Sequence, residues 1–330
     1  MSYKIAFTDV VPDDLMVLVR ESVPPGFELV CVEKPGEDEI IAKVHNADFI
    51  LTFAAAITDN VIRNAPKARL IQRWGVGHEK VDVGAAATAG IPVAVTAGVS
   101  SATVAEHAIM LMLALYKKLT WVHNNMLSGR WVRMQMRLAG HEIQGKVVGV
   151  AGFGNIGQAV ARRLKAFEVS KILYYDAIAR PAAEQELGAE RVSLYDLLRL
   201  SDIVTVHLPL ADDTHHIISR RELALMKPTA LLINAARGGI VDEAALYDAL
   251  RDRKIAGAGM DVHTHEPPLP DDPIFKLSSD PLLGLDNLVV TPHIGSSTEE
   301  NQRAVARRCF DNIVRVSQGL PVTPGDGVTS

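Results

Sequence analysis

The sequence has few of the features that mark extracellular, membrane or nucleic-acid-binding proteins. With two cysteines in 330 residues there is no disulfide framework and no metal-ligand spacing, so Cys31 and Cys309 are expected to be reduced thiols. The formal net charge is −5, and no block of Lys and Arg provides the basic surface that binds nucleic acid. The most apolar stretch, 105–115, is interrupted by His107 and is too short to span a bilayer.

The first residues also lack the pattern of a secretory signal. The segment 1–7 is followed by polar Thr8 and Asp9, without a long apolar core or a cleavage site of small residues. We therefore expect a cytoplasmic location, with neither membrane nor nucleic acid as a partner. The apolar fraction of 48% and the charged fraction of 22% are typical of globular proteins, and the length favours two domains.

Short β-rich runs alternate with helical patterns along the chain, which favours parallel sheets covered on both faces. The first set of predicted strands is 4–8, 27–32, 48–53, 68–74 and 91–96. Six stronger strands are predicted after residue 146, at 147–151, 172–175, 203–207, 230–234, 257–262 and 288–291. The sequence therefore predicts an α/β protein with two doubly wound sheets.

Two helices are expected to mark the domain boundaries. Thr103 and Glu106 form a capping-box pattern at the start of a helix to about residue 119, which is apolar nearly all round. The segment that follows, to Gln144, is rich in Trp and Met without clear periodicity, as in a packed domain or subunit interface. A last helix, capped at 296–298, is expected to return to the first domain. The predicted domains are 1–102 plus 297–330, and 103–296.

A glycine-rich loop follows the strand predicted at 147–151. It reads Gly-Phe-Gly-Asn-Ile-Gly at 152–157 and precedes a helical run, which is the context that gives this pattern its meaning. Its glycines permit a tight turn, close approach of the backbone to a pyrophosphate, and close packing of helix on strand. Asp176 ends the next strand, where a carboxylate accepts ribose hydroxyls and repels a 2′-phosphate. NAD is therefore the predicted cofactor, with Arg180 leaving room for some tolerance of NADP.

Further polar residues follow the ends of successive strands, where doubly wound sheets bind ligands. They are His207 and Pro209, Arg237, Asp261 and His293. The forked guanidinium of Arg237 suits the carboxylate and carbonyl oxygen of a 2-keto acid, and His293 suits acid–base chemistry. His263, His265 and Glu266 lie close enough for a metal site, but no second ligand cluster completes one, so no metal is expected.

In these motifs the chain resembles the D-isomer-specific 2-hydroxyacid dehydrogenases over nearly its whole length. The matching segments are Val-Ala-Glu-His at 104–107, the glycine loop at 152–157, Val-His-Leu-Pro-Leu at 206–210, the Arg237 segment at 234–243, Asp261 with Glu-Pro at 266–267, and Thr-Pro-His-Ile-Gly at 291–295. The resemblance implies a flavodoxin-like substrate domain and an inserted Rossmann dinucleotide-binding domain. It also implies a homodimer that moves a hydride between NAD and a small 2-hydroxy or 2-keto acid.

The resemblance also assigns roles to residues. It implies Arg237, Glu266 and His293 as the catalytic set, with Val76 and Gly77 offering backbone N–H groups to the substrate carboxylate. Asp261 would hold the nicotinamide carboxamide near Thr103 and Ala235. The remaining residues expected to contact the cofactor are Gly152, Gly154, Asn155, Ile156, Gly157, Asp176, His207, Pro209, Thr214, Arg237 and His293.

The chain departs from the family pattern at three places: 78–80, His263, and a segment near 278–284 that is longer than usual. Three other functions remain open, namely a phosphoglycerate dehydrogenase, a phosphite or formate dehydrogenase, and a non-enzymatic NAD-sensing corepressor. The turn at 52–55 carries no cation, which favours unphosphorylated acids such as glyoxylate or hydroxypyruvate.

Overall fold

The structure is a computed structural model that describes residues 2–273 and 287–328, so the segment at 278–284 lies outside the described residues. The chain divides into two compact units. Unit 1 comprises Met1–Ser100 and Ser297–Ser330, and unit 2 comprises Ser101–Ser296. The chain therefore passes from unit 1 to unit 2 after Ser100, whereas the sequence pattern places this domain boundary after residue 102.

Unit 1 is built on a parallel sheet to which the end of the chain adds one antiparallel strand. In its described residues the strand order is β13-β5-β4-β3-β1-β2. The strands are β1 (Tyr3–Phe7), β2 (Phe27–Cys31), β3 (Phe49–Thr52), β4 (Ile71–Arg73), β5 (Val93–Ala94) and β13 (Gly327–Val328). Strands β1 to β5 pair in parallel in the flavodoxin-like order, and β13 pairs antiparallel with β5.

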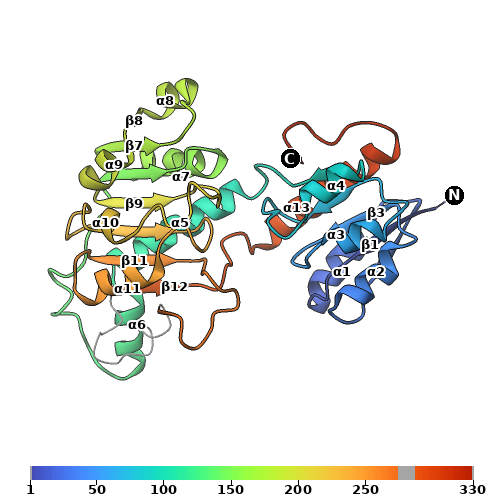
Figure 1. Cartoon of the computed structure of the whole chain (residues 1–330). Helices are drawn as coiled ribbons and strands as arrows, with labels where there is room; N and C mark the ends of the chain where they lie inside the picture. The colour runs from blue at the N-terminus through green and yellow to red at the C-terminus, as the bar shows by residue number, and fades with distance from the viewer. Residues whose placement is uncertain (1, 274–286, 329–330) are drawn as a thin grey trace. The chain divides into compact units, whose positions relative to one another are not determined.

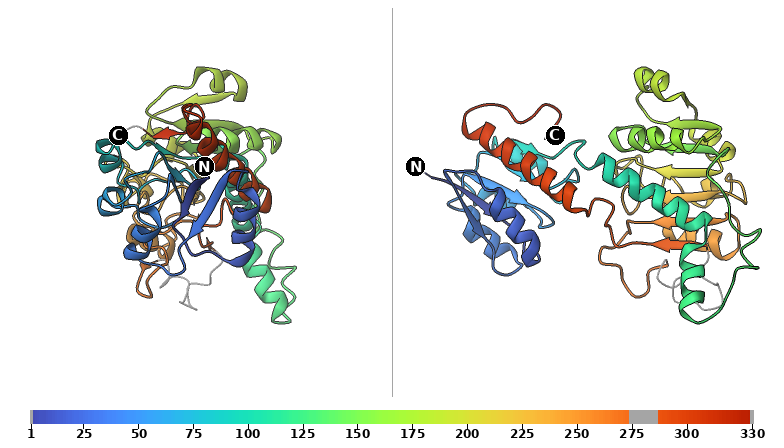
Figure 2. Two further views of the ribbon diagram at one scale, coloured as in Figure 1. Left: turned by 90° about the vertical axis from the view of Figure 1, so that its right-hand side faces the viewer. Right: turned by 180° about the vertical axis from the view of Figure 1, so that it is seen from behind.

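Helices cover both faces of this sheet because each helix has one apolar side. The helices are α1 (Asp13–Ser22), α2 (Glu37–Val44), α3 (Asp59–Arg63), α4 (Val83–Thr88) and α13 (Glu299–Ser317). α1 and α13 pack on one face, where Phe310 and Ile313 meet Phe7 and Phe49, and Figure 2 shows α13 lying along the sheet. α2, α3 and α4 pack on the other face.

A buried carboxylate ties the end of the chain to unit 1. Asp326 is fully buried, and its Oδ1 accepts a hydrogen bond of 2.9 Å from the backbone N–H of Ala97. Its Oδ2 accepts from Asn312 at 2.9 Å and from Arg308 at 3.2 Å, both on α13. These bonds satisfy the charge that burial would otherwise make costly. They also hold the tail where β13 can pair with β5.

Unit 2 is a wholly parallel sheet. In its described residues seven strands follow the order β12-β11-β10-β9-β6-β7-β8, which is a Rossmann sheet with one more strand. The strands are β6 (Val147–Ala151), β7 (Lys171–Tyr175), β8 (Ala189–Arg191), β9 (Ile203–Val206), β10 (Leu231–Asn234), β11 (Gly257–Met260) and β12 (Leu288–Val290). The order reverses between β9 and β6, where sheets of this kind bind ligands at the carboxyl ends of their strands.

Apart from α6, the helices of unit 2 lie on the two faces of this sheet (Figure 1). They are α5 (Ser101–Tyr116), α6 (Leu119–Leu127), α7 (Asn155–Ala166), α8 (Pro181–Leu187), α9 (Leu194–Leu200), α10 (Arg220–Leu223) and α11 (Glu243–Arg251). α5, α7 and α8 cover one face, and α9, α10 and α11 cover the other. In the described part of the chain, no helix is both long and apolar enough to cross a membrane.

Four sequence predictions were wrong. α5 begins at Ser101, so Thr103 lies inside the helix and caps nothing, and Glu106 pairs with Arg163 of α7 at 3.0 Å. The segment after α5 contains the helix α6, which its mixed pattern did not reveal. The second sheet has a strand, β8, that the prediction omits, because a three-residue edge strand carries too little hydrophobic pattern. β13 is missed for the same reason.

Candidate active site

The glycine loop between β6 and α7 is packed so closely that side chains are excluded at two of its three glycines. Gly152 has φ +93°, and a Cβ there would lie 2.5 Å from the backbone carbon of His207. A Cβ at Gly157 would lie 2.1 Å from the carbonyl oxygen of Gly152. A Cβ at Gly154, in contrast, would meet nothing within 4 Å among the described residues. The loop is therefore closely packed at Gly152 and Gly157, whereas the space beside Gly154 is open.

The N-terminus of α7 opens onto this loop. The helix begins at Asn155, and no side chain of the described residues caps its N-terminus. The first backbone N–H groups of a helix have no partner within it, and they favour an anion. The open space over Gly154 and the uncapped N–H groups near Asn155, Ile156 and Gly157 fit the pyrophosphate of a dinucleotide.

Asp176 lies just beyond β7, next to the glycine loop. Its Oδ2 accepts a hydrogen bond of 2.7 Å from the N–H of Phe153, and its Oδ1 accepts one of 2.9 Å from the N–H of Ile178. A cation also lies at this edge, because Arg191 donates to the backbone carbonyls of Asp176 and Ala177 at 2.9 and 3.0 Å. The carboxylate is thus fixed at the place where the adenosine ribose binds in sheets of this type.

The loop after β9 is held by a threonine. Thr214 donates to the carbonyl of Pro209 at 2.6 Å and accepts from the N–H of Ala211 at 2.8 Å. At the start of the loop, His207 Nε2 lies 2.9 Å from the hydroxyl of Thr205, while Nδ1 is buried without a hydrogen-bond partner among the described residues. Burial lowers the pKa of His207 to about 3, so the ring is neutral. The two hydrogen bonds of Thr214 to Pro209 and Ala211 therefore fix the backbone of the loop after β9.

The segment after β10 presents Arg237. Asn234 is fully buried, and its side chain accepts from the N–H of Ala236 and donates to the carbonyl of Arg237 at 3.0 Å. Ala235 is also buried. Gly238 must be a glycine, because a Cβ would lie 1.9 Å from the carbonyl oxygen of His263. The loops after β10 and β11 are thus packed backbone to backbone.

The structure brings His293 and Glu266 together, although 26 residues separate them in the sequence. His293 Nδ1 lies 2.7 Å from Glu266 Oε2, and the side chains are 44% and 38% exposed. Burial acts to raise the pKa of Glu266, but the hydrogen bond from His293 holds it below its ordinary value. The carboxylate is therefore ionised at neutral pH and accepts a hydrogen bond from Nδ1–H of His293. Nε2, on the far side of the ring, has no partner among the described residues.

Asp261 holds the turn that carries His293. It is 2% exposed, and its carboxylate accepts hydrogen bonds from the hydroxyl of Thr291 at 2.5 Å and from the N–H groups of Ile294 and Gly295 at 2.9 and 2.8 Å. Burial acts to raise the pKa of Asp261, but hydrogen bonds led by that from His107 lower it. Most of the hydrogen-bonding capacity of the Asp261 carboxylate is therefore used by groups of unit 2. The sequence did not indicate these bonds. Thr103 lies one turn before His107 on α5.

Val76 and Gly77, the residues expected to bind the substrate carboxylate, lie in unit 1 in the loop after β4. Arg73 supports this loop by donating from Nε to the carbonyl of Gly77 at 2.5 Å and from Nη1 to that of Thr52 at 3.2 Å. Val76 is 36% exposed. Arg73 thus fixes the backbone of this loop, and Val76 remains accessible to solvent.

A nearby carboxylate was missed by the sequence analysis. Asp9 accepts hydrogen bonds of 2.6 to 2.7 Å from the consecutive N–H groups of Phe53, Ala54 and Ala55. Its position directly after the first strand is the signal that could have indicated this role. Three backbone N–H groups of the turn at 52–55 are therefore already bound to the carboxylate of Asp9.

Among the described residues, those at 263–266 included, no three His, Cys, Asp or Glu side chains are grouped so that they could hold a metal ion. His265 Nδ1 lies 2.9 Å from Asp272 instead.

Comparison with known proteins identifies relatives over the whole chain. The family model for the D-isomer specific 2-hydroxyacid dehydrogenase, NAD binding domain, matches residues 109–295. The chain is 38% identical to a glyoxylate reductase of Korarchaeum cryptofilum over 288 residues, which are 86% of this chain and 84% of the relative. It is 36% identical to a D-3-phosphoglycerate dehydrogenase of Archaeoglobus fulgidus over 97% of this chain and 58% of that protein.

The fold has the same relatives. The crystal structure of D-lactate dehydrogenase from Aquifex aeolicus, complexed with NAD and lactic acid, superimposes with a TM-score of 0.86. The sequences are 28% identical, and the superposition covers 99% of each chain.

Proposed function

Because this chain belongs to the D-isomer-specific 2-hydroxyacid dehydrogenase family, we propose that it reduces a small unphosphorylated 2-keto acid, with glyoxylate or hydroxypyruvate favoured. The chain is an NAD-dependent oxidoreductase that acts on a CH–OH group. The observation that carries the proposal is the 2.7 Å contact of His293 with Glu266, at the same edge of the sheet as the glycine loop.

The proposed NAD site is the carboxyl edge of the unit 2 sheet. The residues that would hold the cofactor are Thr103, Gly152, Gly154, Asn155, Ile156, Gly157, Asp176, His207, Pro209, Thr214, Ala235, Arg237, Asp261 and His293. Bound NAD supplies the hydride chemistry at C2. The uncapped N-terminus of α7 supports the placement of the pyrophosphate, and the fixed carboxylate of Asp176 supports that of the ribose.

His293 is the proposed proton donor to the carbonyl oxygen. Its Nδ1 is engaged by Glu266, so Nε2 is the nitrogen that faces a reacting group. Glu266 fixes the ring orientation and stabilises the imidazolium with its negative charge. In the reverse direction the same nitrogen accepts the proton of the substrate hydroxyl.

Arg237 is the proposed anchor for the substrate carboxylate and the carbonyl oxygen. Its planar fork makes two parallel hydrogen bonds, so it both orients the acid and stabilises the negative charge that develops on the oxygen. Within unit 1 the N–H groups of Val76 and Gly77 are the proposed second contact for the carboxylate.

The preference for unphosphorylated acids rests on Asp9. The N–H groups of Phe53, Ala54 and Ala55 could otherwise form a phosphate site, but the Asp9 carboxylate already accepts from all three. A phosphate brought to this turn would meet a negative charge instead of free donors.

The test is NADH oxidation with glyoxylate, hydroxypyruvate, pyruvate and 3-phosphohydroxypyruvate, with the His293→Gln variant as control. Turnover of an unphosphorylated acid that the variant loses is the expected result. Better turnover of the phosphorylated acid would favour the phosphoglycerate dehydrogenase reading. NADH binding without turnover of any acid would favour the corepressor. NAD reduction by phosphite or formate alone would identify those dehydrogenases.

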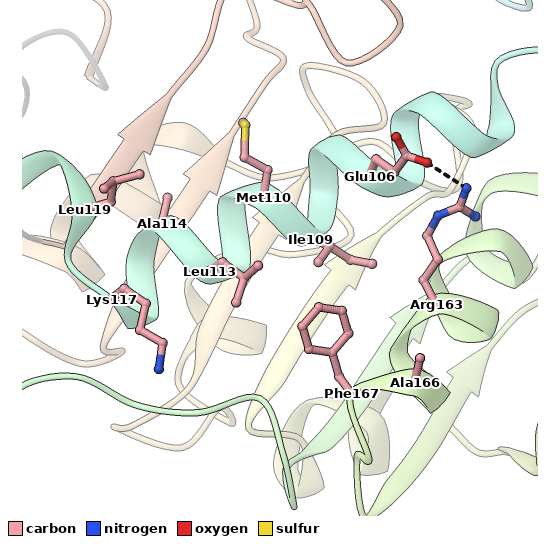
Figure 3. A pocket seen from close by; sticks show the side chains of 10 residues that line it. All are labelled: Glu106, Ile109, Met110, Leu113, Ala114, Lys117, Leu119, Arg163, Ala166 and Phe167. Carbon is pink, nitrogen blue, oxygen red and sulfur yellow. Dashed lines mark hydrogen bonds and ion pairs between the residues drawn. The ribbon is translucent and has the colours of Figure 1, made fainter.

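We also propose that the protein is a cytoplasmic homodimer that packs through unit 2. Ile109 and Leu113 of α5 point toward Phe167 and form an apolar groove with an ion pair of Glu106 and Arg163 at one end (Figure 3). Met110 of α5 also lines this groove, and further large exposed apolar side chains follow along α6 and the segment after it, at Leu119, Met126, Leu127, Trp131, Met134 and Leu138. A surface this apolar is typical of a contact between subunits.

Sedimentation measures the oligomeric state directly. The wild type is expected to sediment as a dimer and the Met110→Glu variant as a monomer, because a charge in the groove would have to lose its water on association. Val17→Glu, at an exposed position of α1, is the matched control and should remain dimeric. A monomeric wild type would contradict this proposal.

A further inference from the structure

Two histidines with little exposed surface contact Thr291, which lies two residues before His293, from different elements. His107 Nε2 lies 3.0 Å from the Thr291 hydroxyl and 3.1 Å from Asp261 Oδ1. His263 Nε2 lies 3.2 Å from the Thr291 carbonyl oxygen. The His107 side chain is 9% exposed and His263 is 7% exposed, so both contacts are shielded from water.

The partners determine which ring nitrogens carry a proton. A carbonyl oxygen only accepts hydrogen bonds, so His263 donates from Nε2 to Thr291. The Thr291 hydroxyl donates to Asp261 at 2.5 Å, so it accepts from Nε2 of His107, whose single N–H is shared with Asp261 Oδ1 at 3.1 Å. Both rings thus act as donors aimed at Thr291, one at its side chain and one at its backbone.

His263 also contacts Glu266. Its backbone N–H donates to Glu266 Oε1 at 3.1 Å, while Glu266 Oε2 is bound to His293. The Nδ1 of His263 is buried and lacks a partner among the described residues. Because a buried nitrogen without a partner is unfavourable, a histidine at this position is not explained by packing alone.

The turn that these contacts hold is a strained one. His293 has φ +55°, in the left-handed region that side chains other than glycine rarely adopt. The backbone N–H of His293 donates to the carbonyl of Asp261 at 2.7 Å, and the next two N–H groups donate to its carboxylate. A conformation of this kind persists only where surrounding contacts over-determine it.

We propose that His107 and His263 are positioning residues that clamp Thr291 and thereby set the orientation of His293 toward Glu266. Neither histidine acts on the substrate. Loss of either donor lets Thr291 shift, and the turn with Ile294 and Gly295 moves with it. The imidazole of His293 then loses the direction that proton transfer requires. The inference rests on the proposed function, in which His293 is the proton donor.

Paired substitutions test the donor directly. Glutamine is long enough to place its amide nitrogen near the position of Nε2, whereas the shorter asparagine reaches only to the position of Nδ1. The variants are therefore His107→Asn and His107→Gln, with His263→Asn and His263→Gln as the second pair. His45→Asn, at an exposed position after α2 in unit 1, is the matched control.

The expected result is a loss in the variants whose amide nitrogen does not reach the position of Nε2. Each asparagine variant should lower kcat for keto-acid reduction about tenfold, with KM within about threefold of the wild type. Each glutamine variant should recover kcat to within about threefold of the wild type. Wild-type kcat in the asparagine variants, or equal losses in both members of a pair, would overturn the proposal.

Hydrogen exchange in the protein without cofactor gives a second readout that does not depend on turnover. The amides of Ile294 and Gly295 should exchange faster in the asparagine variants and at the wild-type rate in the glutamine variants. If the wild type reduces no 2-keto acid, the proposed function fails, and the clamp is then judged on these two amides. Unchanged exchange of the Ile294 and Gly295 amides in the asparagine variants would refute the clamp.

Thr291→Val provides the test if the histidine variants do not fold. This substitution removes, at nearly constant volume, the hydroxyl that accepts from His107 and donates to Asp261, and Thr291→Ser retains both bonds. Faster exchange and lower kcat in the valine variant alone would support the clamp, whereas equal behaviour of the two variants would contradict it.

Discussion

Alanine substitutions at two glycines of the same loop should separate folding from cofactor binding. Gly157 lies in the first turn of α7, where the added methyl would be 2.1 Å from the Gly152 oxygen and ordinary contact begins at 3.4 Å. Overpacking of this kind costs about 3 kcal/mol at the upper end of its usual range. The better helix propensity of alanine returns about 1 kcal/mol.

The net loss for Gly157→Ala is therefore about 2 kcal/mol, which lowers Tm by roughly 4 to 8 °C for a unit of this size. At Gly154 the backbone has φ −77°, which alanine adopts freely, and the methyl would meet nothing within 4 Å. Gly154→Ala should therefore keep the wild-type Tm. The methyl would occupy the space proposed for the pyrophosphate, so Kd for NADH should rise by about tenfold or more.

Thermal unfolding without cofactor and titration with NADH measure the two effects. Gly84→Ala in α4 of unit 1 is the control and should change neither Kd nor Tm by much, because its methyl would meet only Asp82 at 3.6 Å. NADH binding by Gly154→Ala as tight as in the wild type would show that the dinucleotide does not lie on this loop. An unchanged Tm in Gly157→Ala would refute the packing argument.

Three other predictions concern the chemistry. His293→Gln should lower kcat by roughly 10² to 10⁴ with little change in NADH affinity, as for loss of a general acid, and near-native kcat would remove His293 from the mechanism. Arg237→Lys should raise KM and lower kcat together, because an ammonium cannot replace the guanidinium fork, and an unchanged KM would contradict that role. Because the pKa of Glu266 is depressed, its charge persists below pH 4.5 and is lost as the pH falls through the lowered pKa. Glu266→Gln removes this charge at every pH, and a pH–rate profile should show the optimum for reduction at lower pH; an unmoved profile would exclude the pairing from catalysis.

Much of unit 2 could be predicted because its strands are continuous apolar runs bounded by glycine or charged residues. The strand at 147–151 has the predicted bounds, and the glycine loop lies between strand and helix as its pattern requires. The edge strand β8 could not be found in this way, because two of its three residues are exposed and charged and leave it no hydrophobic pattern. Secondary structure of this kind depends on the neighbouring strand more than on its own residues.

The candidate site was predictable in its residue types but not in its contacts. Sequence position indicated that His293 follows a strand, whereas its pairing with Glu266 came from the family resemblance. The clamp on Thr291 joins α5 to the ends of β11 and β12, and no local pattern records such a long-range arrangement. The position of Asp9 after the first predicted strand was its one signal, and its bonds to the turn at 52–55 are long-range in the same way.

The return of α13 and β13 to unit 1 has a consequence for synthesis on the ribosome. One face of the first sheet is covered by Phe310 and Ile313, and its β5 edge is paired by a strand at 327–328 that Asp326 anchors. Unit 2 is continuous in sequence, so it can fold while the last segment is still being made. The first hundred residues therefore wait for that segment with α1 alone on this face, and the apolar surface that α13 will cover stays open to non-native contacts until then.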